Sequence, residues 1–116
     1  MYQRPRFIQA SLPFEGRGLT SPFTLGPDSS YRVAGGMRAQ LIYFRAGNSL
    51  DELVCLSLTR DGAVIRHFPI GAKASVHVPL AVIEELEPGS LLEVTLAAPD
   101  GARGHVIFDI GLMEVD

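Results

Sequence analysis

Apolar and polar residues alternate along most of this chain in short segments, and glycine and proline separate those segments. Alternation with a period of two places apolar side chains on one face of a strand. The clearest case is the pair of segments 53–60 and 63–70, where Val54, Leu56 and Leu58 fall on one face. The pattern therefore predicts strands over most of the chain.

The segments 53–60 and 63–70 are joined by Asp61-Gly62. A two-residue loop of this kind accepts the positive φ angles of a type I′ turn, whose twist matches that of the flanking strands. The sequence therefore predicts a β-hairpin here, with Gly62 at positive φ.

Six further segments have strand character on the same grounds. A long connection covers residues 13–30, with at most a short strand at 22–25, because proline and glycine recur through it. Residues 79–86 have an alternative interpretation as a short helix, since proline is favourable in a first helical turn. The six segments are 7–12, 31–33, 37–46, 74–80, 91–98 and 104–115.

Short strands with turn signals between them are typical of sandwiches and barrels. The chain is also within the usual length of one domain. We therefore expect residues 1–116 to form a single all-β domain: a two-sheet antiparallel β-sandwich, or jelly roll, of about eight strands.

Two of the segments are apolar on both faces, which is typical of a strand covered on both sides. In 37–46, Leu41 and Tyr43 alternate with Ile42 and Phe44, and the last segment repeats this pattern. A lone sandwich exposes one face of each sheet to water, so we expect a homo-oligomer. Its predicted outer-face contacts are Ile42, Phe44, Ile107 and Leu112.

An alternative keeps the chain monomeric, because the long connection 13–30 could fold over that sheet within one subunit. The composition favours an interface between subunits. Apolar residues make up 47% of the chain, and a small domain has much surface for each residue that it buries.

Charge and cysteine content restrict the partners. The formal net charge is −3 and there is no basic run, so no nucleic-acid partner is expected. The single cysteine, Cys55, excludes an intrachain disulfide. No apolar stretch has the length of a membrane helix or a signal peptide, so we expect a cytoplasmic protein with no membrane partner.

Several segments together resemble the galactose-binding-like jelly rolls, a fold shared by many carbohydrate-binding modules. They are residues 31–33 and 41–44, the Val-Pro segment 76–80 and the closing segment 106–115. The resemblance implies a jelly roll and a possible glycan ligand. It implies no calcium, because Phe108 stands where the family commonly has the first of two aspartates. The chain also has no tryptophan for stacking on sugars.

A second resemblance concerns residues 68–73, Phe-Pro-Ile-Gly-Ala-Lys, which are similar to a segment of small bacterial proteins linked with molybdopterin enzymes. This resemblance implies an accessory protein for such an enzyme.

Two sets of residues are candidates for binding. The aromatic residues Tyr31, Tyr43 and Phe68 are a candidate ligand face, since aromatic rings stack on sugars. His67 and His77 fall opposite each other if their strands pair around Ala72, which would provide two ligands of a transition-metal site. Glu or Cys55 would then be the third ligand.

The leading hypothesis is a non-catalytic binding or assembly module, a self-associating jelly-roll subunit that binds a glycan or docks on a larger protein. The main alternative is a small β-sandwich metal protein or enzyme that uses His67 and His77. The accessory protein of a molybdopterin enzyme is a further alternative. No catalytic residue and no cofactor are predicted.

Overall fold

The computed structural model describes residues 3–116, and for residues 81–84 it describes the backbone only. The described residues contain nine strands, one short 3₁₀ turn and no α-helix. The helix considered for residues 79–86 is therefore wrong, because this segment continues the seventh strand. The elements are β1 (Gln3–Glu15), β2 (Phe23–Thr24), η1 (Pro27–Ser29), β3 (Ser30–Arg32), β4 (Arg38–Asn48), β5 (Val54–Arg60), β6 (Ala63–Ile70), β7 (Ser75–Leu86), β8 (Leu91–Ala97) and β9 (Arg103–Val115).

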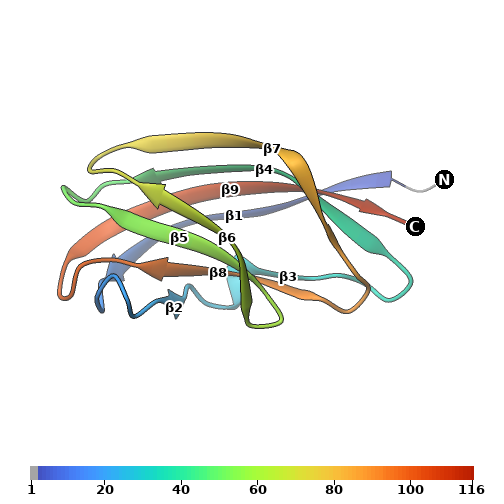
Figure 1. Cartoon of the computed structure of the whole chain (residues 1–116), viewed down its shortest axis with the longest axis horizontal. Helices are drawn as coiled ribbons and strands as arrows, with labels where there is room; N and C mark the ends of the chain where they lie inside the picture. The colour runs from blue at the N-terminus through green and yellow to red at the C-terminus, as the bar shows by residue number, and fades with distance from the viewer. Residues whose placement is uncertain (1–2) are drawn as a thin grey trace.

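The strands form two antiparallel sheets, which lie one above the other in Figure 1. The first sheet has the order β1-β9-β4-β7. The second has the order β2-β8-β5-β6, with β3 also paired to β8. The strand pairs are nested in the sequence. β5 and β6 form the innermost pair, β4 and β7 the next, β2 and β3 with β8 the third, and β1 with β9 the outermost. This is one long hairpin folded into two sheets, the jelly-roll arrangement.

The fold class predicted from the sequence is confirmed. Because β2 and β3 share one position beside β8, nine strands occupy eight positions. The central hairpin is also confirmed: Arg60 pairs with Ala63, and both Asp61 (φ 51°) and Gly62 (φ 87°) have the positive φ of a type I′ turn.

The core lies between the sheets and is built from the alternation seen in the sequence. Val54, Leu56 and Leu58 are fully buried, as their common face predicts. Phe44 from the first sheet stacks on Phe68 from the second, with ring centroids 3.9 Å apart and planes 6° from parallel.

A β-bulge in β4 explains why Phe44 is in the core. Leu41 pairs with Leu112 and Tyr43 with Gly111, so Ile42 is an extra residue in β4. Leu41 and Phe44, three residues apart, therefore both point inward and are fully buried. The prediction of Phe44 as an outer contact is wrong, because it assumed uninterrupted alternation.

Leu112 is also wrong as an outer contact. It follows Val106, Phe108 and Ile110 at intervals of two along β9, and it is 2% exposed. The register shift lies in β4 and not in β9, so inward and outward side chains keep alternating along β9 through Gly111.

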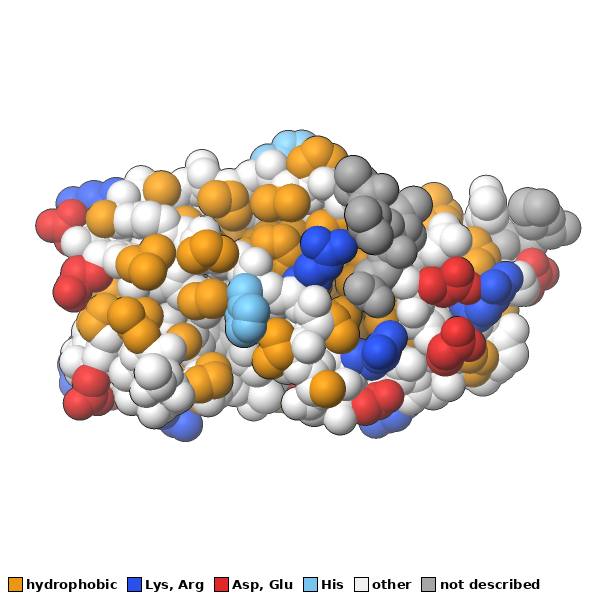
Figure 2. All heavy atoms as spheres, viewed as in Figure 1, with side chains coloured by type: hydrophobic (Ala, Val, Ile, Leu, Met, Phe, Trp, Pro, Cys, Tyr) orange, Lys and Arg blue, Asp and Glu red, His pale blue; other side chains and the backbone are white. Residues whose placement is uncertain are grey.

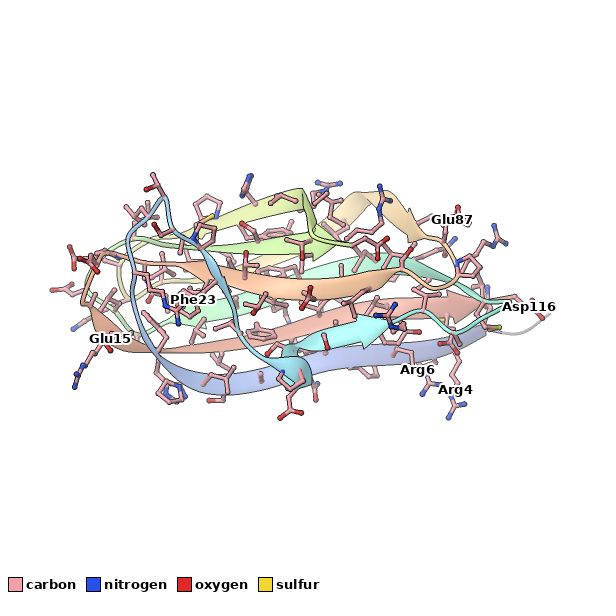
Figure 3. The ribbon with its side chains drawn as sticks, turned by 90° about the horizontal axis from the view of Figure 1, so that it is seen from below. Arg4, Arg6, Glu15, Phe23, Glu87 and Asp116 are labelled. Atoms are coloured by element: carbon pink, nitrogen blue, oxygen red, sulfur yellow. The ribbon has the colours of Figure 1, made fainter. Side chains whose placement is uncertain are left out.

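The connection between β1 and β3 runs along the second sheet, where it crosses in front of β8 in Figure 3. The backbone amide of Gly18 donates to the carbonyl of Ala98 (2.8 Å), and that of Leu25 donates to the carbonyl of Val94 (3.1 Å). The connection therefore leaves the outer face of the first sheet uncovered, contrary to the monomeric alternative. No helix capable of crossing a membrane is found among residues 3–116.

Candidate binding surface on the first sheet

The outer face of the first sheet carries residues in three adjacent rows, set by the strand register. The central row crosses all four strands from Gln9 on β1 through Asp109 on β9 and Arg45 on β4 to His77 on β7. The row on one side contains Ser11, Ile107, Gly47 and Ser75, and the row on the other contains Phe7, Gly111, Tyr43 and Pro79.

Asp109 is the centre of a hydrogen-bond network on this face. Arg45 Nη2 donates to Asp109 Oδ2 at 2.5 Å, and Gln9 Nε2 donates to Oδ1 at 3.2 Å. The Tyr43 hydroxyl lies 3.1 Å from each carboxylate oxygen. The network joins β1, β9 and β4, so it fixes the side chains of three strands relative to one another.

This arrangement favours the charged form of the aspartate. Burial alone would raise the pKa of Asp109, but hydrogen bonds from Arg45, Gln9 and Tyr43 and the charge of Arg45 outweigh it and hold that pKa below its usual value. Burial raises the pKa of the Tyr43 hydroxyl, and the hydrogen bond to Asp109 adds to this effect. The surface therefore carries a fixed Arg45–Asp109 ion pair at neutral pH.

Tyr43 reaches Asp109 only because the residue beneath its ring is glycine. A Cβ atom on Gly111 would lie 2.0 Å from Tyr43 Cε2, which is far inside van der Waals contact. The ring also contacts Arg45, whose guanidinium carbon is 5.4 Å from its centroid, and His77, whose ring meets it edge-on at 6.1 Å. Glycine within a strand commonly marks such a close approach.

Large apolar side chains surround the network and are exposed. Phe7 and Ile107 are each 57% exposed, and Ile42 is 37% exposed. Two open depressions lie beside Ile107, one bordered by Gly47, Ser75 and His77 and the other by Gln9. The surface is therefore apolar and uneven around a polar centre.

The three aromatic residues predicted as a ligand face are not brought together. Phe68 is in the core against Phe44, and Tyr43 is on the outer face of the first sheet. The Tyr31 hydroxyl donates to Glu114, which is 5% exposed, so this tyrosine links β3 of the second sheet to β9 of the first.

The two histidines predicted as metal ligands lie in different sheets. β6 pairs with β5 and β7 pairs with β4, so the pairing around Ala72 that would set His67 opposite His77 does not form. His67 Nδ1 lies 2.8 Å from the Ser57 hydroxyl on the second sheet. Within the described part of the chain, no three potential metal ligands lie together.

Sequence reasoning missed Gln9, Arg45 and Asp109, because no local pattern marks them. Gln9 and Arg45 are 36 residues apart in the sequence, and Arg45 and Asp109 are 64 apart. Only the pairing of β1, β9 and β4 brings the three side chains together. Phe7 was also missed as a surface residue. Successive side chains of a strand point to opposite faces, so placing Ile8 in the core would have placed Phe7 on the outer face.

Comparisons with known proteins give no family. No protein-family model matches this chain, and no curated protein matches it in sequence. Among solved structures, the chain is similar to one in the "Structure of infectious bursal disease virus Gx strain", with 15% identity and a TM-score of 0.44. The match covers 99% of this chain and spans 32% of the length of the other. A similarity at this level supports no conclusion about function.

Proposed function

We propose that this chain is a non-catalytic assembly module that self-associates through the outer face of its first sheet. The observation that carries the proposal is the exposure of Phe7 and Ile107, each 57% exposed on the same face. Exposed apolar groups that cluster on one face of a small domain are typical of an interaction surface.

The free edges of the sheets are poorly suited to association, which favours a face. An edge strand can pair with another chain only where its backbone amides are available, and proline removes one. Each long edge strand contains proline: Pro5 and Pro13 in β1, Pro79 in β7 and Pro69 in β6.

The face is large enough for a specific interface. The first sheet has four strands, and β1 and β9 each have 13 residues. At about 3.4 Å for each residue and about 4.8 Å for each strand, its face measures about 800 Å². A typical stable interface also uses about 800 Å² of each partner. Most of the face must therefore take part.

The expected affinity is modest. Burying a large apolar side chain completely contributes about 1.5–3 kcal/mol. Phe7, Ile42 and Ile107 are already about half buried, so each contributes roughly half of that. These three side chains from each of the two copies together offset only the lower end of the free-energy cost of association, which is about 4–15 kcal/mol. The surplus is therefore small, and we expect a dissociation constant of roughly 0.1 mM or weaker.

Sedimentation velocity over a range of concentrations tests the proposal. The mean mass should rise from the 12.5 kDa of one chain toward twice that value as the concentration approaches the millimolar range. Ile107→Lys should raise the dissociation constant about tenfold or more, because it places a charge within the contact. Val64→Lys is the matched control, since Val64 is 49% exposed but lies on edge strand β6 of the second sheet.

The control also tests another surface. Figure 2 shows the side of the molecule where β6 and β7 form the sheet edges, and apolar side chains gather over its half away from the termini. Val76 and Val78 are half-buried there and already pack against the core. Association lost in Val64→Lys but kept in Ile107→Lys would replace the proposed face with this side. A constant mass of one chain would refute self-association.

Three finer predictions from the sequence have no structural support. The aromatic residues expected to bind a glycan are separated, so glycan binding is not proposed. The link to a molybdopterin enzyme and the cytoplasmic location stay predictions of the sequence.

A further inference from the structure

The outer face of the first sheet has a pattern that is complementary to itself. In two rows the residue on β9 differs from its neighbour on β4 in a complementary way: Asp109 beside Arg45, and Ile107 beside Gly47. In the third row the Tyr43 ring already covers Gly111 of the same copy. Charge is matched with opposite charge, and a large side chain is matched with glycine.

We propose that two copies pack face to face about a two-fold axis that runs along the strands between β4 and β9. This inference rests on the proposed self-association and specifies its geometry. Such an axis exchanges β9 with β4 and β1 with β7 while each row stays level with itself. Sheets that pack face to face keep their strands within about 30° of each other, so a small inclination of the axis accommodates the twist.

The central row then forms a closed set of ion pairs. Arg45 of each copy faces Asp109 of the other, and Gln9 faces His77. The Arg45 side chain is 54% exposed and its guanidinium has five N–H donors. The single hydroxyl proton of Tyr43 binds one oxygen at a time, so Asp109 keeps one of about four acceptor sites for the partner's Arg45.

One flanking row places a projecting residue opposite a hollow, and the other places two exposed apolar residues opposite each other. Ile107 of each copy faces Gly47 of the other, where an open depression is bordered by Gly47, Ser75 and His77. On the other side Phe7 faces Pro79, and both are exposed. These contacts contribute affinity, while the ion pairs set the register and orientation of the two copies.

Mixing two charge-reversal variants tests this geometry directly. In Arg45→Glu the facing groups of a homodimer are all carboxylates, and in Asp109→Arg they are all guanidinium groups. Each variant alone should therefore bind itself at least tenfold more weakly than the wild-type protein does. In a heterodimer of the two variants, every facing pair has opposite charges. Random pairing in an equimolar mixture would make half of all dimers heterodimers, so we expect a larger share than half. Native mass spectrometry separates the species by mass.

A covalent test keeps the inference falsifiable if either variant folds poorly. Ser11 and Ser75 lie on the two outer strands of the first sheet, three strand spacings or about 14 Å apart within one copy. Their Cα atoms are too far apart for an intramolecular disulfide. About the proposed axis, Ser11 of one copy faces Ser75 of the other. Face-to-face sheets lie about 10 Å apart, which is beyond the reach of a disulfide but within that of a short bis-maleimide linker. The variant Ser11→Cys, Ser75→Cys and Cys55→Ser should therefore form linked dimers with such a linker. Ser11→Cys with Cys55→Ser is the matched control and should form few.

The outcomes separate the two proposals. A wild-type protein that stays monomeric refutes self-association altogether. A wild-type dimer with neither heterodimer enrichment nor Ser11–Ser75 linkage refutes the two-fold arrangement and leaves self-association in place. Heterodimer enrichment or Ser11–Ser75 linkage supports the geometry, because a purely intramolecular Arg45–Asp109 pair predicts neither.

Discussion

The two outer faces of the sandwich have the same strand geometry but different side chains. On the second sheet, the row level with His67 contains Ser57, Thr95 and Thr24, all with short hydroxyl side chains. Ser57 is only 6% exposed and its hydroxyl is bonded to His67. On the first sheet, the corresponding positions carry arginine, aspartate and large apolar groups, of which Ile107 is 57% exposed.

The difference indicates how one scaffold separates stability from recognition. Short hydroxyl side chains lie close to their own sheet, and the Ser57 hydroxyl has its partner there. Long charged side chains and exposed apolar groups extend beyond the sheet. The first face therefore provides long side chains that a partner can contact, while this row of the second face offers short ones.

Among single substitutions on the two faces, the greatest loss of stability is expected at Gly111 on the first face. Gly111→Ala should lower the free energy of unfolding by about 1–3 kcal/mol, because the added Cβ displaces the Tyr43 ring from its position over β9. Urea denaturation at concentrations where the protein is monomeric measures the change. Gly35→Ala is the control, because no atom lies within 4 Å of its added Cβ and its φ is not in the left-handed region.

A double-mutant cycle sharpens the Gly111 prediction. In a Tyr43→Ala background the ring is absent, so the cost of Gly111→Ala should fall below about 1 kcal/mol. An unchanged cost in that background would show that the alanine disturbs the backbone of β9 rather than the ring.

A smaller effect is the pH dependence that Asp109 gives to the first face. The folded pKa of Asp109 lies below its unfolded value, so its stabilising contribution is present above the unfolded pKa of about 3.9 and is lost as pH falls through the folded pKa. The stability difference between wild type and Asp109→Asn should therefore be constant near neutral pH and shrink below about pH 4.

Denaturant unfolding at a series of pH values measures this difference, which should be about 1 kcal/mol or less because the pair is partly solvated. Asp100→Asn, a change at an exposed turn residue, serves as the control. A difference that grows as the solution becomes more acidic would contradict the proposed network around Asp109.

The smallest effect is expected on the second face. Ser57→Ala removes the hydroxyl bonded to His67, but His67 is exposed and water can replace the lost partner. We expect a loss of roughly 0.5 kcal/mol in the free energy of unfolding and no change in the association constant. A marked loss of association in Ser57→Ala would mean that the second face, and not the first, contacts the partner.

Local sequence patterns specify the strands and the central hairpin. Alternation between Val54 and Leu58 assigned the buried face of β5, and Asp61-Gly62 assigned a turn with positive φ. These features depend on neighbouring residues only, because side-chain alternation and turn conformation are local properties of the backbone. The all-β sandwich of about eight strands followed from repeating such local assignments along the chain.

Long-range strand pairing determines which residues form the candidate surface. The extra residue at Ile42 turns Phe44 into the core, and its position is fixed by pairing with β9, about 70 residues later. The same long-range pairing puts Asp109 between Gln9 and Arg45 and separates His67 from His77. A strand's own sequence specifies the alternation of its faces but not the register or partner strand, so contacts between distant strands depend on how the sheets assemble.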